Sequence, residues 1–596
     1  MKIRNDSSLF KSEWLIWFPH LLVVCWLIYL GITIWQHAHH SVQPPLYDPL
    51  SYMLKAMNFW QAVEHGKFIN PLNLVPTSRP PGTILMSYPF GFTPDFRGFH
   101  FRSVFFPIIC IIAAVYIVAG TTKARSGRWW MAAIVLLFSS LPMLYQFDKV
   151  DGRYSPVSWG MVDNFQAGIA ALAAAALLRS IMARSQTWLL LSASLAALTL
   201  LIKPSGLMVM ALLALIWLIV ITMEWRWSLG IKSTLSSLRV YAVKGISSIL
   251  IVYISVIVLC VLSGYLSRSN VASGKQAVAT LRQMSHISLQ NALLFFHHSS
   301  GESLLLWVIG VGVLFMYRFR VLKESNDIMS VRVLGVLVGS LFVWILGAWY
   351  WLVVQAGFTQ IRYFYPFMLM GAVCMIPAAL AIWPHANRLI RIILMVICFL
   401  PAVNIAGLMS MGDNPSIFWQ KMAGVSVSVG RDREEIHQAY TFLAELRKGK
   451  QYVQIYSFSN GLLPQIFENV GTYERIVRPS QPSFHSTIPE DWVRGFAVRV
   501  DELLDSDYIL IRKHENHDAS SFLAAKRFDS YGFERTGFEV WLSTLKEQSG
   551  VETVSDGRVL RLLRIVDKAA LSRAIDLFVA AHVWRPEFTM TNLGIM

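Results

Sequence analysis

Long apolar runs constrain this sequence more than any other feature, because no single soluble core can bury them. The chain has 596 residues, of which 55% are hydrophobic and 15% are charged. An α-helix needs about 20 apolar residues to cross roughly 30 Å of hydrocarbon. The sequence therefore predicts a polytopic α-helical membrane protein with about 11 transmembrane helices. The runs lie near residues 14–35, 101–120, 129–147, 161–180, 187–202, 205–223, 242–264, 302–317, 330–354, 363–383 and 392–411.

Charged residues are distributed unevenly between two parts of the chain. Residues 1–411 hold 30 Lys and Arg against 12 Asp and Glu, whereas residues 412–596 hold 22 against 24. In the first part the basic residues gather in alternate short loops, which indicates membrane orientation and not nucleic-acid binding. We expect a cytoplasmic N-terminus and, after an odd number of spans, an extracytoplasmic C-terminus. The basic residues that set this orientation are Lys123, Arg125, Arg128, Arg179, Arg184, Arg226, Lys232, Arg239, Lys244, Arg318, Arg320, Lys323, Arg388 and Arg391.

Two domains follow from this division. Residues 1–411 form the predicted transmembrane domain, with a long first outer loop at 36–100 that carries membrane-lying helices. Residues 412–596 form a predicted soluble α/β domain on the outer face, which lacks any nucleotide-binding motif. Its strand-like runs are 452–458, 507–512 and 538–542, and its helical stretches are 432–447, 491–505, 518–527 and 567–583.

Cofactor signals are weak. All five cysteines fall inside apolar runs, so the sequence indicates neither a disulfide framework nor a zinc site. Three histidines, His37, His39 and His40, follow the first span without a carboxylate at ligand spacing, and we interpret them as interfacial.

The first outer loop holds the most informative candidates for chemistry. Asp48 lies in the segment Pro-Pro-Leu-Tyr-Asp-Pro-Leu and opens a stretch that resembles an amphipathic helix ending near His65. Its carboxylate is either a helix N-cap ahead of Pro49, a reactive group at the bilayer surface, or both. Arg79 precedes two prolines, which would fix its guanidinium near the interface. It either binds phosphate oxygens with its rigid fork of donors or is an ordinary interfacial cation.

Charged residues at span ends supply the other candidates. Lys203 and Arg362 lie beside apolar runs, where charge is costly and often functional. Each could instead snorkel to the interface. Asp163 enters the fourth run. In the second outer loop, Asp151 and Arg153 are second-tier candidates, because they could equally form a local salt bridge.

These motifs, taken in order, resemble the GT-C superfamily of membrane glycosyltransferases. Asp48 and Arg79-Pro80-Pro81 match the family's catalytic acid and later basic residue in the first outward loop. Val162-Asp163-Asn164 resembles its second acidic position, and Arg362-Tyr363-Phe364-Tyr365-Pro366 resembles its R-Y-x-x-P run, which includes the second-tier candidate Tyr363. Leu201 to Gly206 also resembles a family segment. The single acid after Tyr47 departs from the mannosyltransferase branch and favours a bacterial lipid-linked sugar transferase.

The resemblance implies an inverting glycosyltransferase, of the hexosyl- or pentosyltransferase class, in a bacterial inner membrane. It implies a polyprenyl-phosphate sugar donor whose phosphate is bound by Arg79, Lys203 and Arg362, and Asp48 as the catalytic base. Asp163 would orient the acceptor, or Asp48 and Asp163 would hold a divalent cation such as Mg or Mn. The acceptor is a glycan, a glycolipid or a protein.

Two other functions fit the same broad features. An O-antigen polymerase or ligase shares lipid-linked donors, but those enzymes place their large loop between late spans. A transporter or flippase for a glycolipid is also polytopic with basic membrane residues, but it usually shows paired halves with similar broken helices. The sequence shows no such pairing.

Overall fold

The computed structural model divides the chain into two compact units. The first comprises residues 1–40 and 51–427, and the second comprises residues 41–50 and 428–596. The structure describes residues 13–40, 47–67, 70–72, 81–87, 96–120, 128–141, 144–145, 162–229, 232–265, 302–321, 328–354, 361–382, 388–410, 454–458, 485–486, 500–512 and, except for 543, 546, 558 and 559, 541–582.

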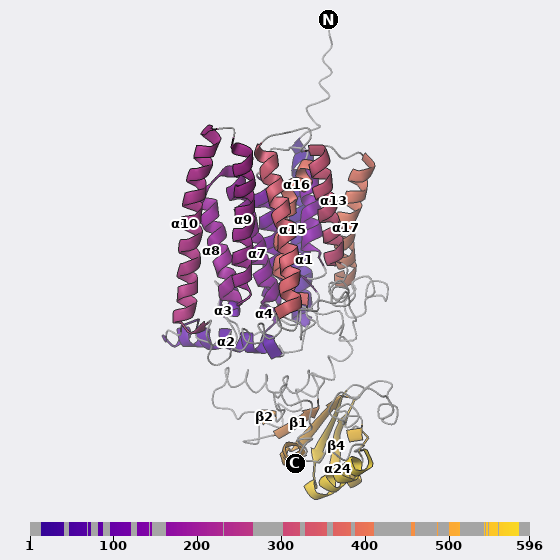
Figure 1. Ribbon diagram of the computed structural model, residues 1–596. Helices are drawn as coiled ribbons and strands as arrows, with labels where there is room; N and C mark the ends of the chain where they lie inside the picture. The colour runs from indigo at the N-terminus through magenta and orange to yellow at the C-terminus, as the bar shows by residue number, and fades with distance from the viewer. Residues whose placement is uncertain are drawn as a thin grey trace. The chain divides into compact units, whose positions relative to one another are not determined.

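A bundle of long helices makes up the first unit (Figure 1). Hydrocarbon offers no hydrogen-bond partners, so the backbone N–H and C=O groups of these apolar segments pair within each helix. The helices are α1 (Glu13–His40), α4 (Phe96–Ala119), α5 (Arg128–Ser139), α7 (Asp163–Ala183), α8 (Gln186–Ile202), α9 (Gly206–Ser228), α10 (Lys232–Leu262), α13 (Glu302–Met316), α15 (Ile328–Val354), α16 (Tyr365–Ile382) and α17 (Arg388–Ser410). A π-helical turn, η4 (Tyr317–Val321), extends α13.

Seven helices among the described residues are long and apolar enough to cross a membrane. Four shorter apolar helices, at Trp129–Ser139, Gln186–Ile202, Ile309–Phe319 and Arg391–Val403, lie over the other predicted runs. The chain is therefore a multi-pass membrane protein, as the sequence indicates, and the total of 11 spans stays a prediction. At the edges of the predicted first loop, α1 continues to His40 and α4 already begins at Phe96.

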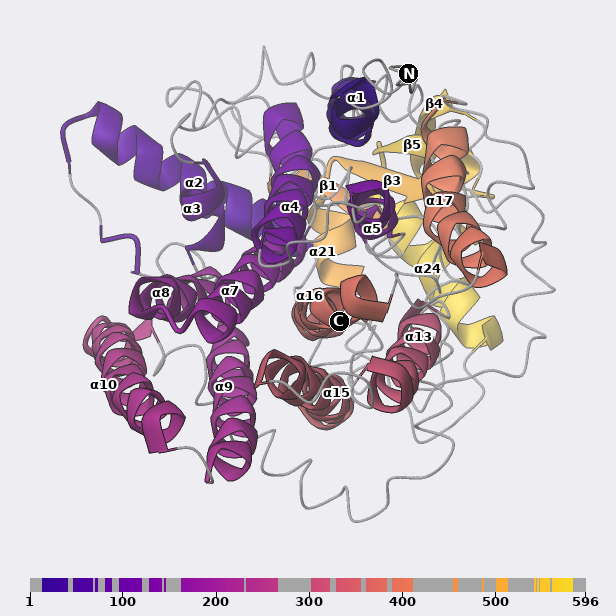
Figure 2. The ribbon, with the colours of Figure 1, turned by 90° about the horizontal axis from the view of Figure 1, so that it is seen from above.

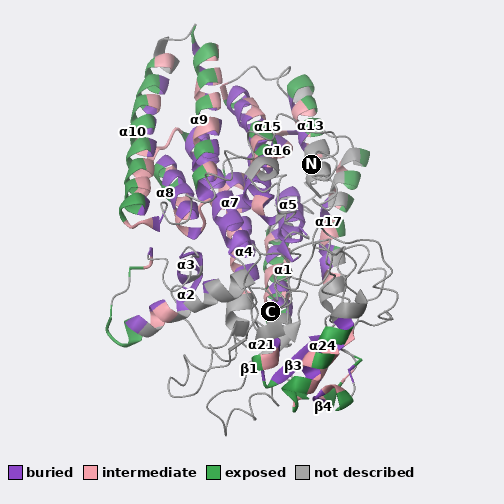
Figure 3. Cartoon of the chain, turned by 60° about the horizontal axis from the view of Figure 1, so that its bottom comes forward, coloured by how far each residue is buried: buried purple, intermediate pink, exposed green. Residues whose placement is uncertain are grey.

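The central helix of the bundle is α7, which is surrounded by α4, α8, α9 and α16 when the bundle is seen end-on (Figure 2). In the apolar segment of α7, 83% of the residues are buried, whereas only 17% are buried in the apolar segment of α10. Figure 3 shows this contrast, with α7 largely buried and α10 largely exposed. Small residues make the close packing possible, because a Cβ at Gly168 would lie 2.9 Å from the Pro107 Cα on α4.

Two short helices cover one end of the bundle. Figure 1 shows α2 (Tyr47–Glu64) lying across this end, next to α3 (Gly82–Ser87). Tyr52 of α2 packs in a buried cluster that includes Val162, and the Trp60 Nε1 donates a hydrogen bond to the Ser87 Oγ at 2.6 Å. The sequence places this helix correctly, since α2 ends one residue before His65.

A tight turn joins α8 to α9 at the same end. Lys203 is extended, with φ −157° and ψ 145°, as expected for a residue that precedes a proline. The turn closes with a hydrogen bond from the Gly206 N–H to the Lys203 carbonyl at 2.9 Å. Any Cβ at Gly206 would lie 2.2 Å from the Leu200 backbone nitrogen, so only glycine fits here.

The second unit contains a five-stranded mixed sheet of order β2-β1-β3-β5-β4. β1 pairs in parallel with β2 and β3, whereas β5 pairs antiparallel with β3 and β4. Buried Leu, Ile, Val and Phe side chains from the strands and helices share one core. The elements are β1 (Gln454–Phe458), β2 (His485–Ser486), α21 (Val500–Asp505), β3 (Tyr508–Arg512), η7 (Glu547–Ser549), β4 (Val551–Asp556), β5 (Leu560–Ile565) and α24 (Lys568–His582).

The structure corrects part of the expected order of elements in this unit. Two expected strands and the last expected helix agree closely with β1, β3 and α24. The strand expected at 538–542 is wrong at its end, because Trp541 and Leu542 are helical. The β4–β5 hairpin was not expected, because β4 alternates weakly and is exposed at most positions. The helices expected at 432–447 and 518–527 lie outside the described residues.

We predict that Gly206→Ala lowers the stability of the protein, whereas Gly312→Ala on α13 does not. Backbone atoms surround position 206 and cannot move aside, so the added methyl group should cost about 1–3 kcal/mol. A Cβ added at Gly312 would meet no heavy atom within 4 Å, so alanine there should be neutral or slightly stabilising. Thermal unfolding of both variants in detergent measures the difference, and equal effects would contradict the packing of this turn.

Candidate active site

Four residues singled out from the sequence lie together at one end of the bundle. We call this the site end: it is where α7 begins, where α8 turns into α9, and where the short 3-10 helix η5 (Ile361–Phe364) precedes α16. Asp163 is the first residue of α7, Lys203 follows the last residue of α8, and η5 carries Arg362 and Tyr363. Segments that are far apart in sequence thus deliver one acid, two cations and one aromatic ring.

A buried ion pair joins Asp163 to Lys203. The Lys203 Nζ donates a hydrogen bond to the Asp163 Oδ1, and the side chains are 13% and 3% exposed for Lys203 and Asp163. The N-terminus of α7 also favours a negative charge at this position. The second oxygen of the carboxylate, Oδ2, is buried and has no hydrogen-bond partner among the described residues. A buried acceptor of this kind is suited to accept a hydrogen bond from a ligand hydroxyl.

The ring of Tyr363 lies against both cations. The Lys203 Nζ is 4.1 Å from the ring centroid, and the Arg362 Cζ is 5.1 Å from it. The Arg362 Nη2 also donates a hydrogen bond to the Tyr363 hydroxyl at 3.3 Å. The negative face of an aromatic ring attracts cations, so the Tyr363 ring favours the positive charges of Lys203 and Arg362 beside it.

Gln166 fixes the turn that carries Lys203. Its Nε2 donates hydrogen bonds to the carbonyls of Thr199 at 3.1 Å and Lys203 at 3.2 Å, and its Oε1 accepts one from the Ser205 hydroxyl at 3.0 Å. Gln166 was not among the residues predicted from the sequence. The signal was a polar residue one turn after Asp163 in an otherwise apolar helix.

Lys55 is a second residue that was not predicted from the sequence. It lies on α2 and is only 3% exposed, and burial lowers its pKa to about 8. It follows Tyr52 by three positions, and residues at this spacing lie on one side of a helix. The signal was a lone lysine within the apolar stripe of α2.

The cluster, as the described residues define it, does not include the remaining candidates from the sequence. Asp48 lies in the first turn of α2, but its side chain is outside the described part of the structure. Arg79, Asp151 and Arg153 also lie outside the described residues, and so do the side chains of the histidines that end α1.

The described residues at the site end do not fit a divalent cation by themselves. Among these residues, no group of three or more His, Cys, Asp or Glu side chains could hold a metal ion. Asp163 has one oxygen engaged by the Lys203 ammonium, which leaves a single oxygen as a ligand. Mg²⁺ usually takes one or two carboxylates together with substrate phosphates, so Asp163 would need further ligands from outside the described residues.

Among the described residues, the cluster contains two basic side chains, Lys203 and Arg362, and one acidic side chain, Asp163. Arg362 is 5% exposed, so its charge lies mostly away from water, where interactions with an anion are strong. An ammonium has three N–H donors, and Asp163 takes one of those of Lys203. The arrangement is therefore suited to bind an anionic group beside a hydroxyl-bearing one.

Comparison with known proteins returns likenesses in structure only. No protein-family model matches the chain, and no curated protein matches it in sequence. Among solved structures, the oligosaccharyltransferase of Archaeoglobus fulgidus in the apo form is 13% identical, with a TM-score of 0.42, over 85% of this chain and 70% of that one.

ArnT from Cupriavidus metallidurans is matched in two states. The structure bound to undecaprenyl phosphate is 12% identical, with a TM-score of 0.42, over 93% of this chain and 98% of that one. The apo structure is 11% identical, with a TM-score of 0.41, over 94% and 98%. At these scores the matches carry no residue role, substrate or reaction over to this chain.

We predict that the Asp163–Lys203 pair behaves as a coupled unit in stability measurements. Asp163→Asn or Lys203→Met alone leaves a buried charge without its partner and should cost about 3–5 kcal/mol. The double variant removes both charges and should be more stable than either single variant. Thermal unfolding of the four proteins in detergent tests this, and additive losses in the double variant would show that the two charges do not interact.

Proposed function

We propose that the chain is an inverting glycosyltransferase that moves a sugar from a polyprenyl-phosphate donor to an acceptor hydroxyl. The observation that carries this proposal is the cluster of Lys203 and Arg362 on the Tyr363 ring beside the buried Asp163. It offers two cations for a phosphate and a carboxylate oxygen for a sugar or acceptor hydroxyl. Its place at the end of a membrane-spanning bundle suits a substrate whose lipid tail stays in the bilayer.

Lys203 and Arg362 bind the donor phosphate in this mechanism. When the bond between the anomeric carbon and the phosphate oxygen breaks, its electron pair and the extra negative charge go to the departing polyprenyl phosphate. Fixed cations in a site that excludes water stabilise such a developing charge strongly. Tyr363 keeps the two cations in place, and Gln166 keeps the Lys203 turn against α7. Arg79 is proposed as a third phosphate ligand.

Asp48 is the proposed general base. The acceptor hydroxyl attacks the anomeric carbon on the face opposite the phosphate, and its proton passes to the Asp48 carboxylate. One displacement inverts the anomeric centre. Position 48 lies in the first turn of α2. The place of Asp48 in the first outer loop, ahead of Arg79-Pro80-Pro81, supports this role.

Asp163 is the proposed orienting group. Its Oδ1 is engaged by Lys203, so its buried Oδ2 is the atom that can accept a hydrogen bond from a hydroxyl of the acceptor or the sugar. This bond would hold the reacting oxygen at a fixed distance from the anomeric carbon, which lowers the entropic cost of reaction. Asp151 and Arg153 stay second-tier candidates.

The proposed setting is a bacterial inner membrane with the site end facing outward. The basic loops support a cytoplasmic N-terminus, so residues 412–596 are proposed to stand outside the membrane as a domain that handles the acceptor. The acceptor is proposed to be a glycan, a glycolipid or a protein of the envelope. A glycolipid transporter or an O-antigen polymerase or ligase is the alternative.

We predict that Asp48→Asn lowers kcat by at least roughly 100-fold and leaves the KM for the donor nearly unchanged. Loss of a general base removes proton transfer but not phosphate binding. The assay follows release of polyprenyl phosphate from a radiolabelled polyprenyl-phosphate sugar, in lipid nanodiscs, with envelope glycans and lipids as the acceptor pool.

Glu64→Gln is the matched control, because Glu64 is an exposed carboxylate at the far end of the same helix. It should leave kcat unchanged. Near-normal turnover by folded Asp48→Asn would show that Asp48 is not the base. Transfer of intact donor across the membrane, without cleavage by the unaltered protein, would favour the transporter.

A further inference from the structure

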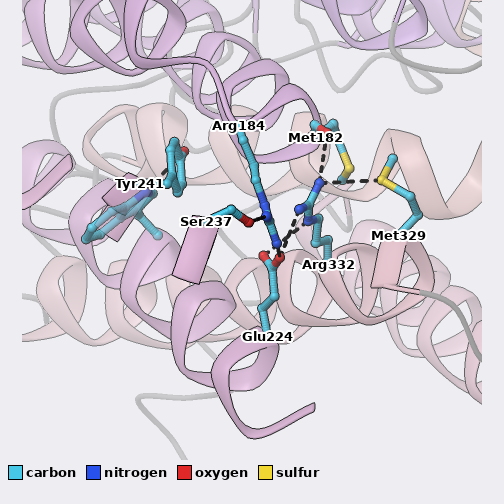
Figure 4. A network of polar contacts seen from close by, with 8 residues as sticks. Met182, Arg184, Glu224, Ser237, Tyr241, Met329 and Arg332 are labelled. Atoms are coloured by element: carbon cyan, nitrogen blue, oxygen red, sulfur yellow. Dashed lines mark hydrogen bonds and ion pairs between the residues drawn. The ribbon is translucent and has the colours of Figure 1, made fainter. Parts of the chain in front are cut away.

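A second buried charge network lies at the opposite end of α7 from Asp163. Figure 4 shows this network from close by. Glu224 of α9 accepts hydrogen bonds from two guanidinium groups. The Arg332 Nε and Nη2 bind its two oxygens at 3.1 and 2.8 Å, and the Arg184 Nη2 binds the Oε1 as well. Glu224 is 2% exposed and Arg332 is 5% exposed. The sequence analysis did not identify Glu224 or Arg332 as a functional candidate.

The network joins the far ends of three helices. Arg184 caps the end of α7, Glu224 lies in the last turns of α9, and Arg332 lies in the second turn of α15. The Arg332 Nη1 also donates to the Met182 carbonyl of α7 at 2.9 Å, so α15 is bound directly to both of the other helices. One carboxylate and two guanidinium groups therefore connect α7, α9 and α15.

The same three helices carry the candidate active site at their other ends. α7 begins at Asp163, α9 follows the turn that holds Lys203, and the chain after α15 leads to Arg362. α7 has 21 residues, so at about 1.5 Å per residue it spans about 30 Å between the two clusters. A helix is stiff along its axis, so a slip of one residue at one end moves the other end by about 1.5 Å.

Apolar side chains pack closely here but carry no directional polar group. The sequence of α7 is rich in alanine, whose small side chain allows close approach of its neighbours. In lipid, apolar surfaces also lack the hydrophobic driving force that they have in water. A carboxylate bound by both donors of a planar guanidinium has a defined geometry, which specifies the alignment of the helices that carry the two groups.

The backbone at Arg184 adds an independent observation. Arg184 has φ 48°, and among the described residues it is the only one other than glycine with a positive φ. Glycine is the usual residue in this left-handed position at a helix end. An arginine in this conformation places its guanidinium on Glu224 and on the Ser237 hydroxyl of α10. The contact thus offsets a backbone conformation that is unfavourable for a residue with a Cβ.

We propose that Arg184, Glu224 and Arg332 are positioning residues that set the register of α7, α9 and α15, and so the spacing of the groups at the site end. The effect on turnover rests on the proposed function. The register itself does not, because it can be measured without any substrate.

The first experiment measures the distance between the site ends of α9 and α15. Nitroxide labels are attached at positions 207 and 349, using Leu207→Cys and Trp349→Cys, whose native side chains are 46% and 40% exposed. Cys25, the one exposed native cysteine, is changed to Ser. Pulsed electron paramagnetic resonance in nanodiscs should show, for Glu224→Gln, a distance distribution that shifts or broadens by about 1.5 Å or more. An unchanged distribution in folded Glu224→Gln overturns the proposal.

Ser139→Ala is the matched control. It removes the hydrogen bond from the Trp26 Nε1 to the Ser139 Oγ at 2.9 Å, which joins α1 to α5 and none of the three helices. It should leave the distance distribution and the turnover unchanged. If Glu224→Gln does not fold, Arg332→Lys takes its place, because it keeps the charge but replaces the two-donor fork with a single ammonium. An unchanged distance in that variant also overturns the proposal.

The double variant Glu224→Gln/Arg332→Gln separates positioning from simple stabilisation. Without either charge of the central pair, it should unfold at a higher temperature than Glu224→Gln, but it should keep the altered distance because the charged fork is gone. Its kcat should stay lowered, since a misplacement of about 1 Å can cost up to about 100-fold in rate. Recovery of both distance and kcat together with stability would contradict positioning. Absence of transfer in the unaltered protein would count against the proposed function and leave the distance result in force.

Discussion

The cost of burying charge in an apolar bundle is the constraint that shapes both clusters of polar groups in this protein. A buried ion whose partner is removed costs about 3–5 kcal/mol, so charges in such a place are paired or serve a function. The buried charged side chains of the described residues are Lys55, Asp163, Glu224, Arg332 and Arg362. Four of them belong to two clusters at opposite ends of the same helices.

Among the described residues, each cluster holds two basic side chains and one acidic side chain, but the two clusters differ in how the carboxylate is bound. At the far end, Glu224 is bound on both oxygens, so its hydrogen-bonding capacity is largely used within the protein. At the site end, one oxygen of Asp163 has no partner among the described residues, and Lys203 and Arg362 both lie against Tyr363. The first arrangement suits a structural role, whereas the second keeps a carboxylate oxygen that no described residue binds.

Much of the site could be predicted from the sequence because its charges stand at the ends of apolar runs. Lys203 and Arg362 were identified in this way, and Asp163 was identified from the resemblance of Val162-Asp163-Asn164 to a family motif. The structure brings these three residues together with Tyr363. Arg332 gave the same kind of signal, as a lone charge inside the run at 330–354. Its importance was missed because its partner Glu224 is identified only by the packing of α9 on α15, which the sequence does not reveal.

The second unit shows where periodicity fails. The apolar residues Trp541 and Leu542 were expected in a strand, but they are helical and Leu542 lies in the core. The exposed strand β4 lacks the apolar alternation of a half-buried strand, so it gave no signal. Its pairing with β5 depends on partners chosen in three dimensions, which local sequence does not specify.

The proposed function depends above all on a phosphate binding between Lys203 and Arg362 at the site end. A cryo-electron-microscopy structure of the protein in nanodiscs with added undecaprenyl phosphate would show where the phosphate lies. We expect density for it within hydrogen-bond distance of the Lys203 Nζ and the Arg362 guanidinium, with the lipid tail between the helices. Phosphate density elsewhere in the bundle, with the Lys203, Arg362 and Tyr363 cluster unoccupied, would contradict the proposal.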